Sequence, residues 1–175
     1  MTKPKLYVET TSFIDMAKEA VGTLPKDRDD DVWFAKRLLE AHRDGKIAVY
    51  TATLTVAECQ HADGIADERV QKLFKAILTS GQHLFLVQDT VLIAERARNL
   101  RWNHKLAFRG ADAMHVASAL EMGCSEFITA DDKIISRAAE LSCLGLRVVR
   151  ARDTSFLPAE YRQGTLQGIL PGKAK

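Results

Sequence analysis

Short strand-like runs alternate with longer helix-like runs along this chain, and that alternation limits the fold to a few architectures. The strand-like runs are KLYVE (5–9), KIAVYT (46–51), HLFLVQ (83–88), EFIT (126–129) and LRVVR (146–150). Each run is short, rich in β-prone residues and bounded by polar or turn residues. Strands separated by helices pair in parallel, and the helices cover both faces of the sheet. The alternation therefore predicts an α/β fold, a three-layer α/β/α sandwich with a central parallel sheet.

The helix-like runs carry apolar residues at helical spacing. Within residues 29–42, for example, Val32, Ala35 and Leu38 fall on one face, and aspartates open the run. Similar patterns predict helices over residues 11–20, from residue 53 or 55 to about 62, and over 67–78, 90–103, 111–122 and 132–141.

The length of 175 residues is typical of one domain with a sizeable core. Residues 1–150 contain all the predicted elements, and no repeat or linker indicates a second domain. The segment 151–175 contains Pro158, Pro171 and several glycines, so we expect a C-terminal tail or peripheral arm there.

The sequence contains neither a run apolar enough to span a bilayer nor the apolar core of a secretory signal at its N-terminus. Cys59, Cys124 and Cys143 form no CxxC pair and no zinc-ligand spacing, so reduced thiols are expected. We therefore expect a cytoplasmic protein with no membrane partner. The net charge of +2 does not by itself indicate nucleic-acid binding.

Four acidic residues stand at the ends of strand-like runs or at the starts of helix-like ones. They are Glu9, Glu58, Asp112 and Asp131. An α/β fold collects such element ends along one edge of its sheet, where the carboxylates repel one another unless a positive charge lies among them. Because Mg²⁺ and Mn²⁺ prefer oxygen ligands, the pattern suggests a metal site with open positions, whose natural substrate is a phosphodiester.

Two of these acids have a structural alternative that the sequence leaves open. Glu9 could be a strand end that reaches water. Glu58 lies three residues after Thr55, as in a capping box, where the glutamate bonds back to the first amide of a helix.

The other two acids also stand where helices favour an acidic residue. Asp112 falls in a first helical turn, where the helix dipole stabilises a carboxylate, and it shares a face with His115, which we expect to be at most a packed neighbour of the site. Asp131 and Asp132 open the next helix, so one of the two is expected to be its N-cap.

Segments DAMHVASAL (112–120) and FITADDK (127–133), preceded by the acid-Thr-Thr of residues 9–11 and the early-helix Glu58, resemble the PIN-domain nucleases. The closest resemblance is to the VapC-like ribonuclease toxins of toxin–antitoxin pairs, over about residues 5–150. It implies a PIN-like fold, in which Glu9, Asp112 and Asp131 bind Mg²⁺ or Mn²⁺ and Glu58 completes the catalytic acids. Supporting residues would be Thr10, Thr11, Thr129 and Asp132. The family's usual first acid is Asp, and this chain has Glu9 instead.

The resemblance implies a metal-dependent endoribonuclease that hydrolyses RNA with a metal-activated water. It also implies an antitoxin partner that blocks the acidic cleft with a basic side chain, and we expect it to dock in the groove formed by the helices before and after the 21–30 loop. A homodimer is left open. Two other functions stay open as well: a structure-directed DNA nuclease of the same superfamily, and a non-catalytic module that binds nucleic acid or protein.

A cluster of cations between residues 96 and 109 offers candidates for RNA phosphate contacts. These are Arg96, Arg98, Arg101, Lys105 and Arg109, with His104 among them. The alternative is an ordinary solvated helix face, which is what most charge runs are.

Overall fold

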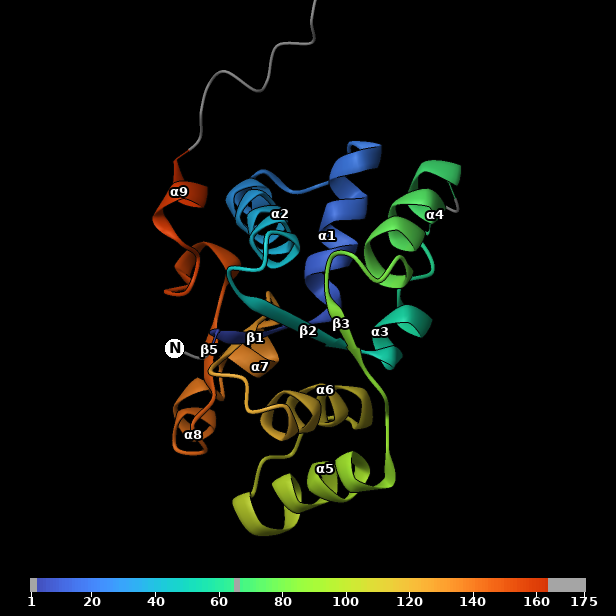
Figure 1. Cartoon of the computed structure of the whole chain (residues 1–175). Coiled ribbons are helices and arrows are strands. Elements are labelled where there is room, and N and C mark those ends of the chain that lie inside the picture. The colour runs from blue at the N-terminus through green and yellow to red at the C-terminus, as the bar shows by residue number, and fades with distance from the viewer. Residues whose placement is uncertain (1–2, 65–66, 164–175) are drawn as a thin grey trace, which may run out of the picture.

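A computed structural model describes residues 3–64 and 67–163 of the chain (Figure 1). Its centre is a five-stranded sheet in the order β3-β2-β1-β4-β5, and every neighbouring pair is parallel. The strands are β1 (Lys5–Val8), β2 (Ala48–Ala52), β3 (Phe85–Val87), β4 (Glu126–Ile128) and β5 (Arg147–Val149). The predicted α/β class and central parallel sheet are confirmed.

Helices cover both faces of the sheet. The longer ones are α1 (Thr10–Val21), α2 (Asp29–Arg43), α5 (Val91–His104) and α6 (Gly110–Glu121). The shorter ones are α3 (Thr53–Glu58), α4 (Glu68–Phe74), α7 (Asp132–Ile135), α8 (Ala138–Ser142) and α9 (Ala159–Arg162), with single turns η1 (Lys26–Arg28), η2 (Lys75–Thr79) and η3 (Ala151–Asp153). In Figure 1, α1, α2 and α4 lie above the sheet and α5 and α6 lie below it.

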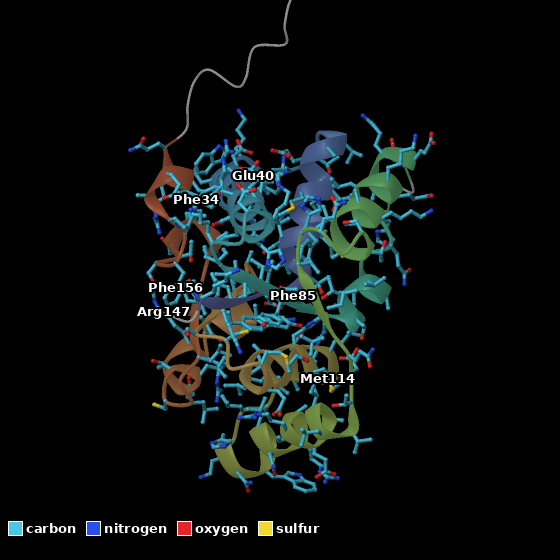
Figure 2. The ribbon with its side chains drawn as sticks, in the orientation of Figure 1. Phe34, Glu40, Phe85, Met114, Arg147 and Phe156 are labelled. Carbon is cyan, nitrogen blue, oxygen red and sulfur yellow. The ribbon has the colours of Figure 1, made fainter. Side chains whose placement is uncertain are left out.

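The two layers follow from the alternation of side chains along the strands. On β1, Leu6 and Val8 belong to the core between the sheet and α1, α2 and α4. Tyr7 belongs to the core between the sheet and α5 and α6. Because the central strands are buried on both faces, their sequences are mostly apolar, with Thr51 of β2 and Glu126 of β4 as buried polar exceptions. Figure 2 shows the side chains that fill both spaces, with Met114 on α6 and Phe85 on the edge strand β3.

Three local predictions are corrected by the structure. The predicted helix 132–141 is two short helices, α7 and α8, and Ser136 between them donates its hydroxyl to the carbonyl of Lys133, in competition with the helical pattern. Helix α3 ends at Glu58, so the helix after β2 is a single short one. Helix 67–78 ends in the wider turn η2.

Residues 151–163 pack against the body of the domain. Leu157 is buried in the core, and η3 and α9 both contact α2. The fully buried carboxylate of Glu126 accepts hydrogen bonds from the Thr154 hydroxyl at 2.5 Å and from the Ser155 hydroxyl at 2.8 Å. Residues 164–175 lie outside the described residues, so the expected division at residue 150 stays a prediction.

No helix among residues 3–64 and 67–163 is long and apolar enough to cross a membrane.

Candidate functional site

The four acids lie at the carboxyl edge of the sheet. Glu9 directly follows β1, and Asp131 follows the neighbouring strand β4. Asp112 stands in the first turn of α6, and Glu58 is the last residue of α3. Parallel pairing explains this arrangement, because it brings the ends of adjacent strands to the same edge.

Glu9 is buried and held in one orientation. Its side chain is 6% exposed, and its Oε2 accepts hydrogen bonds from the Thr11 amide (3.1 Å), the Thr11 hydroxyl (2.5 Å) and the Thr129 hydroxyl (3.0 Å). Burial raises the pKa of Glu9, and the hydrogen bonds from Thr11 oppose that rise. The alternative of a strand end in water is therefore wrong, because Glu9 is the buried N-cap of α1.

Thr11 and Thr129 connect Glu9 to the segment that carries Asp131. The Thr11 hydroxyl accepts from the Ala130 amide at 3.2 Å, and the Thr129 hydroxyl accepts from the Asp131 amide at 3.0 Å. Each hydroxyl thus donates to Glu9 and accepts from the backbone beyond β4. The two threonines fix the relative positions of the ends of β1 and β4.

Glu58 is bound by groups that the sequence did not associate with it. Its Oε2 accepts from the Thr10 hydroxyl at 2.5 Å and from His115 Nε2 at 2.8 Å. The hydrogen bond from His115 lowers the pKa of Glu58, so this carboxylate is ionised at neutral pH. The capping-box alternative is wrong: α3 begins at Thr53, Ala52 is its N-cap, and the buried Thr55 bonds the Thr51 hydroxyl at 2.8 Å.

His115 belongs to a buried chain of hydrogen bonds that sequence reasoning missed. The imidazole is 1% exposed, and its Nδ1 lies 2.7 Å from the hydroxyl of Tyr7, which accepts from the Ala52 amide at 2.9 Å. Burial raises the pKa of Tyr7 well above its usual value, so the phenol keeps its hydrogen and donates it to Nδ1. We therefore assign the imidazole hydrogen to Nε2, from which it is donated to Glu58. A tyrosine inside an apolar strand gives no sequence signal for this pairing.

Asp112 is the acid with the fewest protein partners. It is half-buried, and within the described part of the chain its carboxylate accepts no hydrogen bond. Burial is the main cause that raises the pKa of Asp112, and the negative charge of Asp131 adds to it. The charges of His115 and Arg109 offset part of that rise, so Asp112 lies at the edge of the core with nearby positive charge but without a hydrogen-bond donor among the described residues.

Asp131 and Asp132 have separate roles in the structure. Asp131 is the N-cap of α7, and its Oδ1 accepts from the Lys133 amide at 2.8 Å. Asp132 is exposed and binds Arg150 at 2.9 Å. The expectation that one of the two caps the helix is met by Asp131, which is also the candidate ligand.

The chemistry of these donors fits a hard divalent cation. Carboxylate oxygens are the preferred ligands of Mg²⁺ and Mn²⁺. Burial raises the pKa of Glu9, and burial together with the charge of Asp131 raises the pKa of Asp112, so a nearby cation would favour the charged form of both. The side-chain positions, however, define no coordination sphere. Among residues 3–64 and 67–163, no three His, Cys, Asp or Glu side chains are grouped closely enough to hold one ion.

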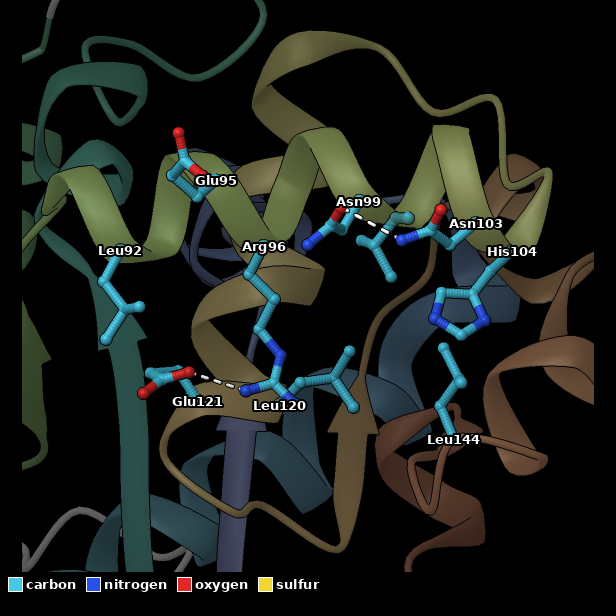
Figure 3. A pocket seen from close by; sticks show the side chains of 10 residues that line it. Leu92, Glu95, Arg96, Asn99, Asn103, His104, Leu120, Glu121 and Leu144 are labelled. Atoms are coloured by element: carbon cyan, nitrogen blue, oxygen red, sulfur yellow. Dashed lines mark hydrogen bonds and ion pairs between the residues drawn. The ribbon is translucent and has the colours of Figure 1, made fainter.

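The predicted basic cluster is divided between two sides of α5. Arg96 binds Glu121 of α6 at 2.6 Å, in a hollow of about 430 Å³ that is lined by none of the four acids (Figure 3). Arg98, Arg101, Lys105 and Arg109 do not line that hollow. Arg109 instead lines a hollow of about 240 Å³ together with Asp112, Lys133 and Arg137.

Comparisons with known proteins agree with this fold. A sequence model of the PIN domain matches residues 20–141, which include Glu58, Asp112 and Asp131 but not Glu9. Among solved structures, VapBC2 from Rickettsia felis bound to a DNA fragment from its promoter is similar, with a TM-score of 0.57 and 13% identity over 83% of this chain and 97% of that chain. FitAB bound to the IR36 DNA fragment is similar with a TM-score of 0.53 and 18% identity over 85% and 96%. A search of curated protein sequences found no match.

Proposed function

Because the chain belongs to the PIN domain family, we propose that it is a metal-dependent endoribonuclease and the toxin of a toxin–antitoxin pair. The observation that carries the proposal is the collection of four acids from distant segments at one edge of the sheet, one of which, Asp112, has a raised pKa and no hydrogen-bond partner among the described residues. A folded protein tolerates such repulsion where it serves a function.

In the proposed site, Glu9, Asp112 and Asp131 hold Mg²⁺ or Mn²⁺ directly or through water. The cation supplies a water of lowered pKa and neutralises charge on the scissile phosphate. Glu58 stays ionised beside the site, because His115 donates to it. Thr11 and Thr129 orient Glu9, and its Oε1, which makes no hydrogen bond with the described residues, is the oxygen left for a ligand.

The antitoxin part of the proposal is supported by the similar structures. VapBC2 and FitAB were both solved as assemblies on DNA fragments, and this chain shares their fold over most of its length. We infer a partner that presents a basic side chain to the acidic edge of the sheet. Between the helices on either side of residues 21–30, α1 and α2, the described residues leave a hollow of about 10 Å³, which Thr129, Ala130 and Ala151 also line. That volume holds about one water and no side chain of a partner, so the docking position stays a proposal.

A cleavage assay tests the proposed activity. Labelled single-stranded RNA should be cut in Mg²⁺ or Mn²⁺, and cutting should stop in excess EDTA and return when the metal is restored. Asp112→Asn should reduce the rate by about 100-fold or more, since loss of even an outer partner of a metal ligand costs roughly 10- to 100-fold. Asp30→Asn is the matched control: it also removes an acid from a first helical turn, on α2, and should cut at the normal rate.

Each alternative gives a different result in the same assay. Cleavage of flap DNA without cleavage of RNA would identify a DNA nuclease. Metal binding without cleavage of either polymer would identify a non-catalytic module. RNA cleavage that continues unchanged in excess chelator would overturn the metal mechanism.

A further inference from the structure

A shallow hollow of about 380 Å³ lies between α5 and the start of α6, next to the acidic site. Its floor consists of small and apolar side chains of these two helices and of the connection between them. Its rim carries Arg98, Arg101 and Trp102, and no acidic residue is present among the described residues that line it. The hollow is therefore apolar at its base and positive at its edge.

Trp102 is the largest apolar side chain left in solvent at this hollow. It is 65% exposed, and the Arg98 guanidinium lies over its ring, 4.5 Å from the centroid. An exposed indole beside arginines is the arrangement with which proteins stack an unpaired base and hold its phosphates.

The positive charge around Trp102 is largely free to act on a ligand. Arg98 is also bound to Glu95 at 2.6 Å, so part of its charge is compensated. Arg101, Arg109 and Lys133 are exposed, and within the described ranges they form no ion pair with a carboxylate, although Arg109 is close enough to Asp112 to lower its pKa. Such a cluster attracts a polyanion in preference to a neutral or acidic partner.

The hollow at Trp102 adjoins the one at Asp112. Phe108 lines both hollows, and Arg109 and Lys133 line the second one together with Asp112. A strand that lies on Trp102 and passes Phe108 therefore arrives at the proposed catalytic acids.

We propose that this surface, which we call the Trp102 track (Arg98, Arg101, Trp102, Phe108, Arg109 and Lys133), binds single-stranded RNA and leads it to Asp112. Trp102 stacks on one base, and Arg101, Arg109 and Lys133 hold phosphates between that base and the acids. The inference rests on the proposed nuclease function and adds the form of the substrate: unpaired bases, because a base stacked in a duplex cannot stack on an indole. It also selects among the basic residues, since Arg96 faces the other hollow and binds Glu121.

Binding of a labelled single-stranded RNA oligonucleotide in EDTA, where no cleavage occurs, tests the track. Trp102→Ala should raise the Kd by about 5- to 100-fold, the usual effect of removing a stacking ring, and Trp102→Phe should restore most of the affinity. Arg101→Ala should reduce the slope of log K against log salt by about 0.7, as expected for one lost phosphate contact on a single strand. In a Trp33→Phe background, RNA should quench the fluorescence of Trp102, the one tryptophan that remains.

Two controls match these variants. Trp33→Ala also removes a tryptophan with an arginine over its ring, Arg37 at 5.1 Å, but on α2, and Arg96→Ala removes a charge from the opposite side of α5. Both should bind RNA as wild type does. Losses equal to that of Trp102→Ala in either control, or an equal loss of duplex RNA binding in Trp102→Ala, would overturn the track.

The failure of the track and the failure of the proposed nuclease are distinguishable. If RNA is cleaved with metal while Trp102→Ala leaves both Kd and KM unchanged, the track is wrong and the nuclease stands. If RNA quenches Trp102 and binds as predicted but is never cleaved, the track stands and the nuclease is wrong.

Discussion

At the scale of single residues, Asp112 and Glu58 show how one site shifts the pKa values of two carboxylates in opposite directions. Burial and the charge of Asp131 raise the pKa of Asp112, whereas the hydrogen bond from His115 lowers that of Glu58. The first acid is destabilised as an anion when no cation is near, and the second is already compensated by the protein. This contrast makes Asp112 the acid whose removal is most informative.

We expect Asp112→Asn to be more stable than wild type at pH 7 in EDTA, and the difference to shrink as the pH falls toward 4. The pKa of Asp112 is higher in the folded protein than in the unfolded one. The protonated side chain therefore stabilises the fold fully at pH values below the unfolded pKa, and this stabilisation is lost as the pH rises through the folded-state pKa. Urea unfolding at both pH values measures this. Adding Mg²⁺ should stabilise wild type more than the variant, because ligands that bind the native state stabilise it.

Asp67→Asn is the matched control, for which the expected change in stability at pH 7 has the opposite sign. Asp67 also stands at a helix start, but hydrogen bonds from Arg69 lower its pKa, so its contribution is present above the unfolded pKa and is lost as the pH falls. That variant should therefore lose stability relative to wild type at pH 7 and less so at pH 3. An Asp112→Asn protein that unfolds earlier than wild type at pH 7 without metal, yet cleaves RNA normally, would reduce Asp112 to a helix-start residue.

At the scale of elements, the chain of hydrogen bonds from Ala52 to Glu58 ties four elements together. Tyr7 comes from β1, Ala52 ends β2, His115 lies on α6 and Glu58 ends α3. Each link is short, from 2.7 to 2.9 Å, and the Tyr7 ring also stacks on Phe127 of β4 at 5.2 Å. The orientation of Glu58 thus depends on how these elements pack, not on α3 alone.

Tyr7→Phe should cost about 1–3 kcal/mol of unfolding free energy, since it keeps the ring and leaves the buried Ala52 amide and His115 Nδ1 without their partner. Because His115 then loses the group that fixes its hydrogen on Nε2, kcat for RNA cleavage should fall while KM changes little. Urea unfolding and steady-state cleavage give the two readings.

The control for this variant is Tyr50→Phe on β2. Its phenol makes no hydrogen bond within the described ranges, so the change should stay within about 0.5 kcal/mol of wild type and leave cleavage intact. A Tyr7→Phe protein with normal kcat would show that Glu58 is oriented without the chain.

At the scale of the whole molecule, the acidic edge of the sheet and the hollow with arginines at its rim lie side by side. A toxin with these two features should slow growth when it is expressed alone, through RNA cleavage. Asp112→Asn should abolish the effect at equal expression, since it removes the charge that the cation needs. Growth curves with immunoblots of the expressed protein provide the measurement.

The toxin proposal predicts a small antitoxin encoded in the neighbouring reading frame. Its co-expression should restore growth, and the two proteins should purify as a complex. The rescue should depend on a basic residue of that partner, because the acidic edge is what it would block. Harmless overexpression of an enzyme that is active in the cleavage assay would contradict the toxin role, without contradicting the nuclease.

The sequence alone determined the class of the fold and the candidates for the site. Alternation of strand-like and helix-like runs is a local property of the chain, and parallel pairing then places the ends of β1 and β4 at one edge whatever the details of packing. Glu9 and Asp131 could therefore be named from their positions after strands. Asp112 could be named because it opens a helix whose face continues into the core.

The tertiary structure decided what each of these side chains contacts. The partners of Glu58 are 48 and 57 residues away in the chain, and no local pattern distinguishes that arrangement from a capping box. In the sequence, Tyr7 has the pattern of an ordinary strand residue. Only the packing of α6 against β1 brings its hydroxyl to His115, which is 108 residues away. The basic residues also depend on the tertiary structure. One run in the sequence occupies two sides of α5, because the helical turn places Arg96 at Glu121 and Arg101 at the hollow that Trp102 lines. Local propensity fixes elements, whereas contacts between elements depend on packing across long separations, which only the folded chain decides.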